Sequence, residues 1–423
     1  MEFKYKSTVL LVIGLIIGAL SGYQLGINGF SSSLKKFPPQ INVKNTTAPQ
    51  NLDFAEYWKV WDILRENHIF RDQVTASDML AGSLKGLANS FNDPYTHYLD
   101  KQENQALTET IEGKYSGIGA ELGVKDNNII IVSPLDGSPA KEAGLKAGDY
   151  IISVDKTSVV GMNINEVVNL IRGEKGTEVV LQVIKEGEDS PRNIKITRDE
   201  IHIDSVRWEN KGDGIAYIRV SRFGTATNSE WNSIIDKILT EIGSDNLVGI
   251  VIDVRQDPGG VLNSAIHLAN EFLNKDIAVI WQETADGMQT PYKTTRKGKF
   301  TDLNLNIVVL TDEGSASASE ILAGALRDKA DAVLVGVKSF GKGTIQESIQ
   351  LENNNALNVT IAKWLTPSKQ WIHKTGIVPD IEVKIPDDFK VGDSDPQLAK
   401  AIEIAKMGKE SFLQNILRKV NVF

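Results

Sequence analysis

Residues 307–326 read IVVLTDEGSASASEILAGAL: an apolar run, a short polar turn and a second apolar run. The β-branched residues at 307–311 predict a buried strand, and the spacing after the turn predicts a helix. Ser317 and Glu320 have the spacing of a capping box at the start of that helix. Strand, turn and helix in this order are typical of an α/β fold.

Similar patterns surround this stretch. Strands are predicted at 247–254 and 332–337, and strands alternate with longer helices over roughly 212–385, which predicts an α/β core. Residues 110–200 differ, because short β-branched runs alternate there with glycine turns around one amphipathic helix at 165–171. Helical spacing also marks 53–64 (with Asp53 as its N-cap), 80–91 (ended by Asn92-Asp93-Pro94) and 397–423.

The composition excludes several kinds of chemistry. The 423 residues are 41% hydrophobic and 24% charged, which indicates a globular protein of two to four domains. Lys plus Arg number 46 and Asp plus Glu 55, so the net charge of −9 leaves no general basic surface for nucleic acid. Cysteine is absent, which excludes disulfides, thiolate metal sites and a cysteine nucleophile. No metal-ligand motif occurs, and we expect no cofactor.

The N-terminus has the pattern of an export signal. Lys4 and Lys6 precede an apolar run at 9–20, and residues 31–50 are a Ser-, Pro- and Asn-rich tether. The apolar run is marginal for a membrane span, and 19–21 offer a weak cleavage site. We therefore expect an extracytoplasmic protein in the cell envelope, either secreted or held by a membrane anchor, with the anchor slightly favoured.

A glycine turn at 115–122 (YSGIGAEL) stands before an alternating strand. The backbone N–H groups of Gly117, Ile118, Gly119 and Ala120 can converge there to hold a carboxylate, and the strand with helix 165–171 can form a groove for an extended peptide. Taken alone, the Gly-x-Gly pattern is better explained by a plain hairpin turn.

A serine mechanism is the chemistry to test at the 307–326 stretch. Ser317 is a simple capping residue on one interpretation, but a serine at a strand-to-helix turn also exposes its hydroxyl beside N-terminal backbone donors. The N–H of Ala318 is placed to stabilise an oxyanion, and the Pro-Gly-Gly turn at Gly259 and Gly260 can supply a second donor.

The candidate base is Lys342, which can act only if its pKa falls from about 10.4 toward neutrality. Its flanking residues, Gly341 and Gly343, permit a tight turn that could bury it. A competing hypothesis is a phosphate-binding loop, because Gly336-x4-Gly341-Lys342 nearly matches that motif. However, the next residues alternate like a strand, whereas a phosphate-binding loop opens a helix.

Two resemblances follow from these motifs. Residues 115–122, the stretch SPAKEAGLKAGD at 138–149 and IISV at 151–154 resemble a PDZ domain of the bacterial type, which implies capture of protein C-termini with apolar last residues. The whole of 52–385 resembles the C-terminal processing peptidases, or tail-specific proteases. Three spacings carry this second resemblance: Asp328 lies 11 and Lys342 lies 25 residues after Ser317, and Gln346 lies four after Lys342.

The resemblance implies a role for each residue. Ser317 would be the nucleophile, Lys342 the base and Gln346 the group that orients the lysine, while Asp328 would be structural. Ala318 with Gly260 or Gly259 would form the oxyanion hole, and Arg172 would link peptide occupancy to the active site. The family usually has Asn-Asn-Pro-Gly-Gly where this chain has Gln256-Asp257-Pro258-Gly259-Gly260.

The implied fold class is multi-domain α+β, with a PDZ domain inserted between a helical cap and a crotonase-like α/β protease core. The expected segments are a signal peptide or anchor (1–25), a tether (26–51), the helical cap (52–108), the PDZ domain (109–200), the protease core (201–385) and a C-terminal helical segment (386–423).

The implied function is that of a serine endopeptidase acting on protein substrates with exposed, apolar tails. Two alternatives remain: a PDZ scaffold that binds tails without cutting them, and a Ser–His–Asp hydrolase that uses His267 or His373. The state of assembly, including a homo-oligomer, is left open, as is membrane contact through an uncleaved N-terminus.

Overall fold

The structure of the chain is a computed structural model that describes residues 30–33, 40–43, 53–125, 128–135, 137–185, 188, 190–202, 204–386 and 394–407. The predicted export signal and most of the tether lie outside these residues. No helix in the described ranges is both long and apolar enough to cross a membrane. The chain divides into two units, Met1–Leu80 and Ala81–Phe423.

The first unit contains a small hairpin and the first predicted helix. Strands β1 (Phe30–Ser33) and β2 (Gln40–Val43) pair antiparallel, and α2 (Ala55–Asn67) is followed by the 3-10 turn η1 (Arg71–Gln73). The N-cap of α2 is Phe54, so the prediction of Asp53 was one residue too early, although the Asp53 carboxylate accepts the Ala55 N–H at 2.8 Å.

Helix α3 (Ala76–Asn89) crosses into the second unit and ends close to the predicted stop. Its apolar side chains are largely uncovered: Leu80 is 53% and Leu87 65% exposed, and Ala88 is the buried residue of the helix. The periodicity therefore predicted the helix correctly but did not show what covers its apolar face.

Helix α4 (Lys101–Glu112) and strand β4 (Lys114–Gly117) lead into the predicted PDZ domain. Asp100 and Glu103 form a complete capping box at the start of α4, and Gly113 ends it in the left-handed conformation at φ 68°. Strand β4 pairs antiparallel with β11 (Asp199–His202), so the two connections to this domain lie side by side.

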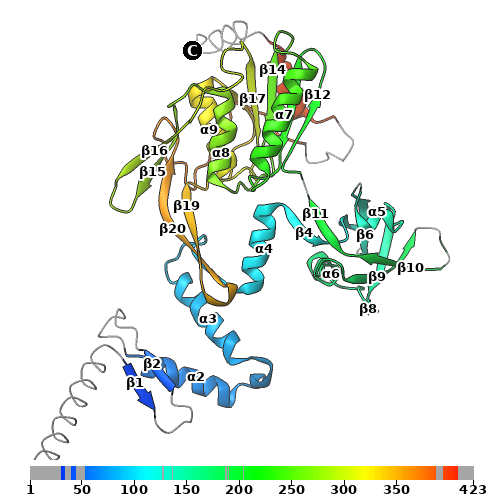
Figure 1. Cartoon of the computed structure of the whole chain (residues 1–423), viewed down its shortest axis with the longest axis vertical. Helices are drawn as coiled ribbons and strands as arrows, with labels where there is room; N and C mark the ends of the chain where they lie inside the picture. Colours follow the sequence, from blue (N-terminus) through cyan, green and yellow to red (C-terminus); the bar gives the residue numbers. More distant parts are fainter. Residues whose placement is uncertain are drawn as a thin grey trace, which may run out of the picture. The chain divides into compact units, whose positions relative to one another are not determined.

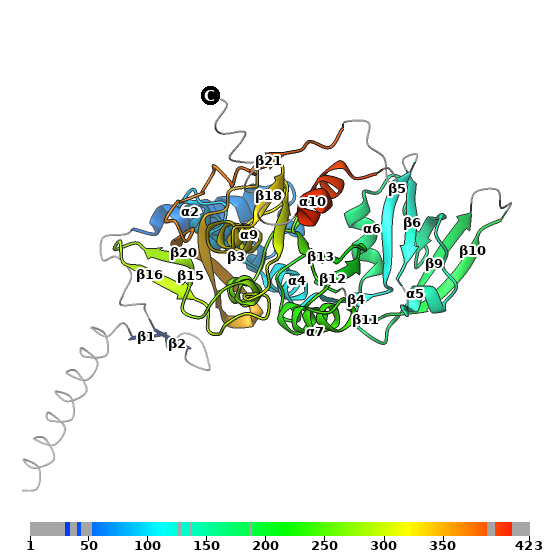
Figure 2. The same cartoon turned by 90° about the horizontal axis from the view of Figure 1, so that it is seen from above.

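A twisted antiparallel sheet in the order β10-β9-β7-β6-β5, with β8 beside β7, forms the predicted PDZ domain (Figure 2). Its strands are β5 (Ala120–Lys125), β6 (Asn128–Pro134), β7 (Asp149–Val154), β8 (Thr157–Ser158), β9 (Glu178–Lys185) and β10 (Arg192–Thr197). Helices α5 (Pro139–Glu142) and α6 (Ile164–Ile171) accompany it. Because β5 lies at the edge of the sheet, its outer backbone groups are available to an added strand.

A six-stranded sheet in the order β12-β13-β14-β17-β18-β21 builds the core. Its strands are β12 (Val206–Asn210), β13 (Ile215–Val220), β14 (Gly249–Asp253), β17 (Asn306–Thr311), β18 (Val333–Gly336) and β21 (Ile381–Glu382). All neighbours are parallel except β12 and β13. The strands predicted at 247–254, 307–311 and 332–337 are therefore confirmed as β14, β17 and β18.

Helices cover both faces of this sheet. Helices α7 (Thr227–Glu241), α8 (Leu262–Ala269) and α9 (Ala318–Ala330) lie on one face (Figure 1), and the 3-10 turn η2 (Asn270–Phe272) follows α8. Helix α10 (Pro396–Lys406) packs on the other face, where its Ala401 and Ile404 meet Val251 and Val308. The central strands are buried on both sides, which explains their continuous apolar runs. The predicted C-terminal helix is confirmed to Lys406, and 408–423 lie outside the described residues.

A second sheet has the order β16-β15-β20-β19, and β3 pairs with β20. Its strand β19 directly follows the loop that holds Lys342. Its strands are β3 (His97–Leu99), β15 (Ala278–Thr284), β16 (Gln289–Lys293), β19 (Thr344–Gln350) and β20 (Ala356–Leu365), with the 3-10 turn η3 (Glu352–Asn354) between the last two. Strand β3 brings the segment after α3 against this second sheet.

Candidate active site

Three adjacent parallel strands end at the same edge of the core sheet. The turn after β14 holds Gly259 and Gly260, the turn after β17 holds Ser317, and the loop after β18 holds Lys342. Since β14, β17 and β18 are neighbours, their carboxyl ends bring together three segments that are far apart in the sequence.

Ser317 stands at the N-cap of α9 with φ 55° and ψ −113°, a backbone conformation that is strained for a residue with a side chain. Its carbonyl accepts the Ile321 N–H at 2.9 Å, and its own N–H donates to Glu320 Oε2 at 2.9 Å. Ser317 is partly exposed, whereas Ala318 and Glu320 are fully buried. The turn thus presents the Ser317 side chain at the N-terminus of a 13-residue helix.

Glu320 ties the serine turn to the lysine loop. Its Oε1 accepts the Ser339 hydroxyl at 2.6 Å and the Gly341 N–H at 2.7 Å, while its Oε2 accepts the N–H groups of Ser317 and Lys342, both at 2.9 Å. Burial raises the pKa of this carboxyl, and the four hydrogen bonds oppose that rise. The glutamate that the sequence identified as a capping residue therefore fixes the two catalytic segments relative to each other.

Lys342 is partly buried, and its Nζ lies 4.8 Å from the centre of the Tyr95 ring. Burial lowers the pKa of Lys342, against the opposing charges of Asp93 and Glu320. Both Asp93 and Tyr95 come from the segment between α3 and β3. The direction of the pKa shift is the one that a lysine base requires.

Ser317 and Lys342 open into one cavity of about 480 Å³. Apolar side chains from α4, the segment after β13 and the start of α8 form much of its wall. The lining residues are Leu107, Thr110, Ile111, Arg222, Phe223, Pro258, Gly259, Gly260, Val261, Leu262, Ser317, Ile321, Lys342, Thr344, Ile345, Gln346, Ser348, Asn358 and Trp364.

The two glycines of the oxyanion turn are not equivalent. A Cβ on Gly259 would lie 2.8 Å from the Ala318 nitrogen and 2.9 Å from the Ser317 Cβ, so only glycine fits against the serine turn. However, the Gly259 N–H already donates to Asp257 Oδ1 at 2.8 Å. Gly260 is exposed, and its N–H has no acceptor among the described residues. The geometry favours Ala318 and Gly260 as the pair of free donors.

Gln346 lines the same cavity, but its amide is held by threonines. Its Nε2 donates to Thr344 Oγ1 at 2.9 Å and to Thr360 Oγ1 at 3.0 Å. Within the described ranges, no hydrogen bond joins Gln346 to Lys342. Asp328 does not line the cavity; its Oδ2 accepts the Ser368 N–H at 3.0 Å, which agrees with a structural role.

A second cavity, of about 470 Å³, lies between β5 and α6 in the predicted PDZ domain. Gly117, Ile118, Gly119 and Ala120 all line it, as the sequence predicted. Gly119 has φ +73°, and a Cβ there would lie 2.5 Å from the Ser138 Cβ, so the turn requires glycine. Leu122, Leu135, Ile164, Val168 and Ile171 make the rest of the groove apolar.

Arg172 lies at the end of this groove and contacts α4. Its guanidinium lies 5.1 Å from the centre of the Tyr115 ring, and its Nη1 lies 3.9 Å from Glu109 Oε2. Helix α4, which carries Glu109, also lines the serine cavity through Leu107 and other residues of its last turns. Helix α4 thus lines the serine cavity directly and reaches the groove through the contact between Glu109 and Arg172.

The structure does not support two of the competing sequence interpretations, the histidine-dependent hydrolase and the phosphate-binding loop. No histidine lines the serine cavity. His267 of α8 forms a hydrogen bond with Asn232 of α7 at 2.9 Å, and His373 stacks on Trp371 with 5.2 Å between the ring centres. The segment after Lys342 is strand β19, and the N–H groups of Gly341 and Lys342 are occupied by Glu320, so the loop is not built to hold phosphate.

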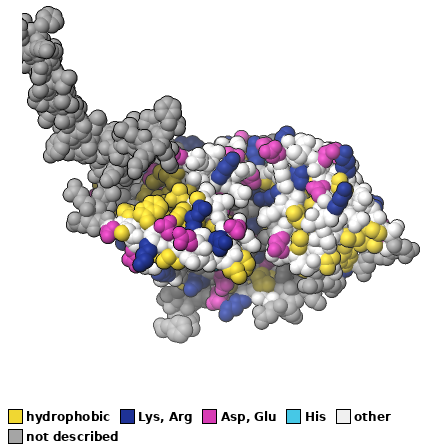
Figure 3. Space-filling view, turned by 90° about the horizontal axis from the view of Figure 1, so that it is seen from below, with side chains coloured by type: hydrophobic (Ala, Val, Ile, Leu, Met, Phe, Trp, Pro, Cys, Tyr) yellow, Lys and Arg dark blue, Asp and Glu magenta, His cyan; other side chains and the backbone are white. Residues whose placement is uncertain are grey.

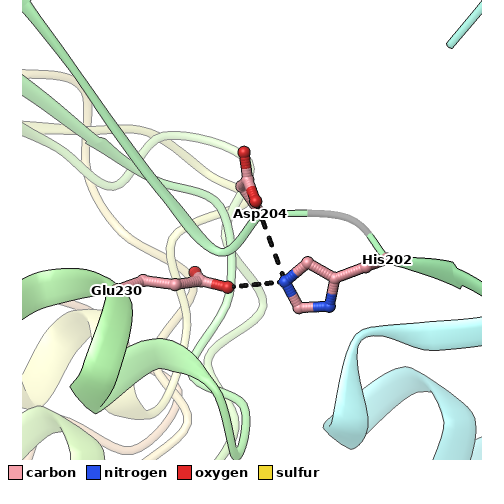
Figure 4. A group of neighbouring side chains, drawn as sticks. All are labelled: His202, Asp204 and Glu230. Atoms are coloured by element: carbon pink, nitrogen blue, oxygen red, sulfur yellow. Dashed lines mark hydrogen bonds and ion pairs between the residues drawn. The ribbon is translucent and has the colours of Figure 1, made fainter. Parts of the chain in front are cut away.

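One group of three metal-ligating side chains occurs in the described part of the chain: His202, Asp204 and Glu230 (Figure 4). His202 Nε2 lies 2.8 Å from Glu230 Oε1 and 3.7 Å from Asp204 Oδ1. The other Glu230 oxygen accepts the N–H groups of Ser205 and Val206. These contacts fasten the β11–β12 connection to α7, and the group needs no ion to account for them.

The face in Figure 3 carries basic and acidic side chains interspersed, with hydrophobic side chains gathered in patches. This mixture agrees with the moderate net charge of −9.

Sequence reasoning missed two parts of the site. Tyr95 was overlooked because its segment was interpreted only as the end of a helix, and nothing in the local pattern links it to Lys342. The bracing role of Glu320 was also missed, although its position three residues after the serine was the available signal.

A PDZ-type groove, joined to an α/β core that presents a serine at a strand-to-helix turn and a partly buried lysine, defines a PDZ-containing serine peptidase. Comparison with known proteins agrees with this class. Residues 214–383 match Peptidase family S41, and residues 130–185 match the PDZ domain. Two relatives from Bacillus subtilis (strain 168) match nearly the whole chain.

The carboxy-terminal processing protease CtpB is 37% identical over 394 residues, which cover 92% of this chain and 79% of the relative. The carboxy-terminal processing protease CtpA is 35% identical over 384 residues, covering 90% and 78%. A crystal structure from Bacteroides fragilis NCTC 9343, assigned to the S41 proteases, shares the fold with a TM-score of 0.52 at 18% identity, over 81% of this chain and 95% of that one. The chain belongs to peptidase family S41 and is a carboxy-terminal processing serine protease with a PDZ domain.

Proposed function

We propose that the protein is an exported endopeptidase that captures the C-terminal tails of protein substrates in the groove between β5 and α6 and cleaves upstream peptide bonds with Ser317 and Lys342. The observation that carries this proposal is the shared cavity, which contains a partly exposed serine at a helix N-terminus, a lysine with a lowered pKa and the free N–H of Gly260. The export part rests on the N-terminal sequence.

In the proposed reaction, Ser317 Oγ attacks the substrate carbonyl carbon while neutral Lys342 accepts the hydroxyl proton. The N–H groups of Ala318 and Gly260 bind the oxyanion. Lys342 then returns the proton to the leaving amine, and water releases the acyl group with Lys342 again as base. The hydrogen bonds of Gln346 go to Thr344 and Thr360 and hold β19 in place. Gln346 therefore orients Lys342 indirectly, through the position of the strand that follows it.

Tail binding is proposed to use the edge of β5. An extended peptide adds to this edge as a strand, its terminal carboxylate meets the backbone of residues 117–120, and its apolar last side chain enters the groove. Arg172 is proposed to report occupancy, because it lies at the groove and contacts Glu109 of α4, the helix that also lines the serine cavity.

The experiment is cleavage of an unstructured protein that ends in apolar residues. We expect Ser317→Ala and Lys342→Ala each to abolish cleavage, while both variants still bind the tail. Lys338→Ala on the same loop is the control and should remain active. Near-normal cleavage by Lys342→Ala would refute the assignment of the base. A parent protein that binds tails without cutting them would instead support the scaffold alternative.

A further inference from the structure

Asp257 is a fully buried carboxyl group directly behind the oxyanion turn. Its Oδ1 accepts the Gly259 N–H at 2.8 Å, whereas its Oδ2 has no hydrogen-bond partner in the described part of the chain. The Asp257 backbone carbonyl accepts the Ala316 N–H at 3.0 Å and the Ser319 hydroxyl at 2.9 Å. One residue therefore holds the turn after β14 and the turn that carries the nucleophile together.

The carboxyl group lies close to the place where negative charge develops during cleavage. It is one hydrogen bond away from Gly259, and Gly259 lies against Ala318 and Ser317. An ionised Asp257 would therefore place a negative charge next to the oxyanion that the N–H groups of Ala318 and Gly260 stabilise. A like charge on a buried group is weakly screened by water, so its repulsion of the oxyanion raises the energy of the transition state.

The surroundings of Asp257 set its protonation. Burial raises the pKa of this carboxyl to about 7, against the opposing effects of the Gly259 hydrogen bond, the nearby Ser319 hydroxyl and the charges of Arg219 and Arg222. The neighbouring helix α9 presents the Ser319 hydroxyl, and the Glu320 carboxylate is turned toward the lysine loop. A neutral carboxyl can still accept the Gly259 N–H through its carbonyl oxygen, and it avoids the cost of burying an ionised oxygen without a donor.

We propose that Asp257 is a positioning residue that supports catalysis as a neutral carboxylic acid, and that its ionisation weakens cleavage by placing a buried negative charge beside the oxyanion site. The proposal rests on the Ser317–Lys342 mechanism. Loss of a proton has the opposite effect at Lys342, because this residue must be neutral to serve as a base. The rate of cleavage should therefore rise with pH as Lys342 loses its proton and fall with pH as Asp257 ionises. These two titrations limit activity to a range of pH.

The first test compares kcat and KM from pH 5 to pH 9 for the parent and Asp257→Asn, which keeps the shape and an acceptor oxygen but cannot ionise. The ratio of variant to parent kcat should rise about tenfold between pH 6 and pH 9, with little change in KM. The control is Asp328→Asn, an aspartate outside the cavity, whose ratio should stay level. A level ratio for Asp257→Asn, or loss of its activity at every pH, would overturn the proposal.

The second test needs no catalysis and is made in a Ser317→Ala background. Because the pKa of Asp257 is raised from its ordinary value of 3.8, the folded state binds more protons, and stability from this group is lost as the pH rises through about 7. The melting temperature should therefore fall less between about pH 5 and about pH 8 when Asp257→Asn is added. An equal fall would contradict the proposal. Residual cleavage by Ser317→Ala would refute the proposed function separately.

Discussion

Replacement of Glu320 by glutamine should weaken both the fold and the activity, because this side chain joins the nucleophile turn to the lysine loop. Its two oxygens accept four hydrogen bonds, from Ser339, Gly341, Ser317 and Lys342, at 2.6–2.9 Å. Glutamine has almost the same shape, but only one of its two terminal groups accepts hydrogen bonds. Two of the four donors would then face an NH₂ group.

The expected magnitude follows from these contacts. A buried donor left without its acceptor costs about 1–3 kcal/mol, so two such donors lower the free energy of unfolding by about 2–6 kcal/mol. For a domain of about 170 residues this corresponds to a fall in melting temperature of at least about 4 °C. Cleavage should fall by about a hundredfold or more, since the N–H groups of Ser317 and Lys342 share the Oε2 acceptor.

Differential scanning fluorimetry and cleavage of a tail-bearing substrate measure the two effects. Glu313→Gln is the matched control, because Glu313 is an exposed glutamate on the same strand-to-helix turn. If Glu320→Gln melted within error of Glu313→Gln and cleaved equally fast, the bracing role derived from the four hydrogen bonds would be wrong.

Three further results are expected. Val168→Asp in the apolar groove should weaken tail binding roughly tenfold to a hundredfold in fluorescence polarisation, whereas Val124→Asp, on β5 outside the groove, should not. Tyr95→Ala should move the rising limb of the pH profile to higher pH, since loss of the ring lets water reach Lys342 and relieves the burial that lowers its pKa; Tyr95→Phe should leave the limb in place. Arg172→Ala should reduce kcat on tail-bearing substrates, and an unchanged kcat would remove this arginine from the link between groove and active site.

The sequence allowed the core to be predicted because its signals are local. Gly260, Ser317 and Lys342 each follow a short apolar strand that is rich in β-branched residues. Each strand ends in a turn that contains glycine or serine, and the start of the next element is clear. The PDZ groove was predictable for the same reason, since its glycine turn, edge strand and helix lie within about sixty residues.

The remaining features depend on contacts between distant segments. Tyr95 reaches Lys342 across 247 positions of sequence, and the pairing of β3 with β20 brings that segment to the site. Sequence also could not choose between Gly259 and Gly260, because the choice depends on the hydrogen bond that Asp257 accepts from Gly259. The apolar residues of α3 gave the correct helix but not its environment, since periodicity does not identify what packs on a face.

The most direct test of the central claim is covalent labelling with a serine-directed fluorophosphonate, read by intact mass and peptide mapping. The account predicts a single adduct on Ser317, no adduct in Ser317→Ala, and labelling of Lys342→Ala that is slower by orders of magnitude at neutral pH. An adduct on another serine, or labelling of Lys342→Ala at the parent rate, would contradict a mechanism in which Lys342 activates Ser317.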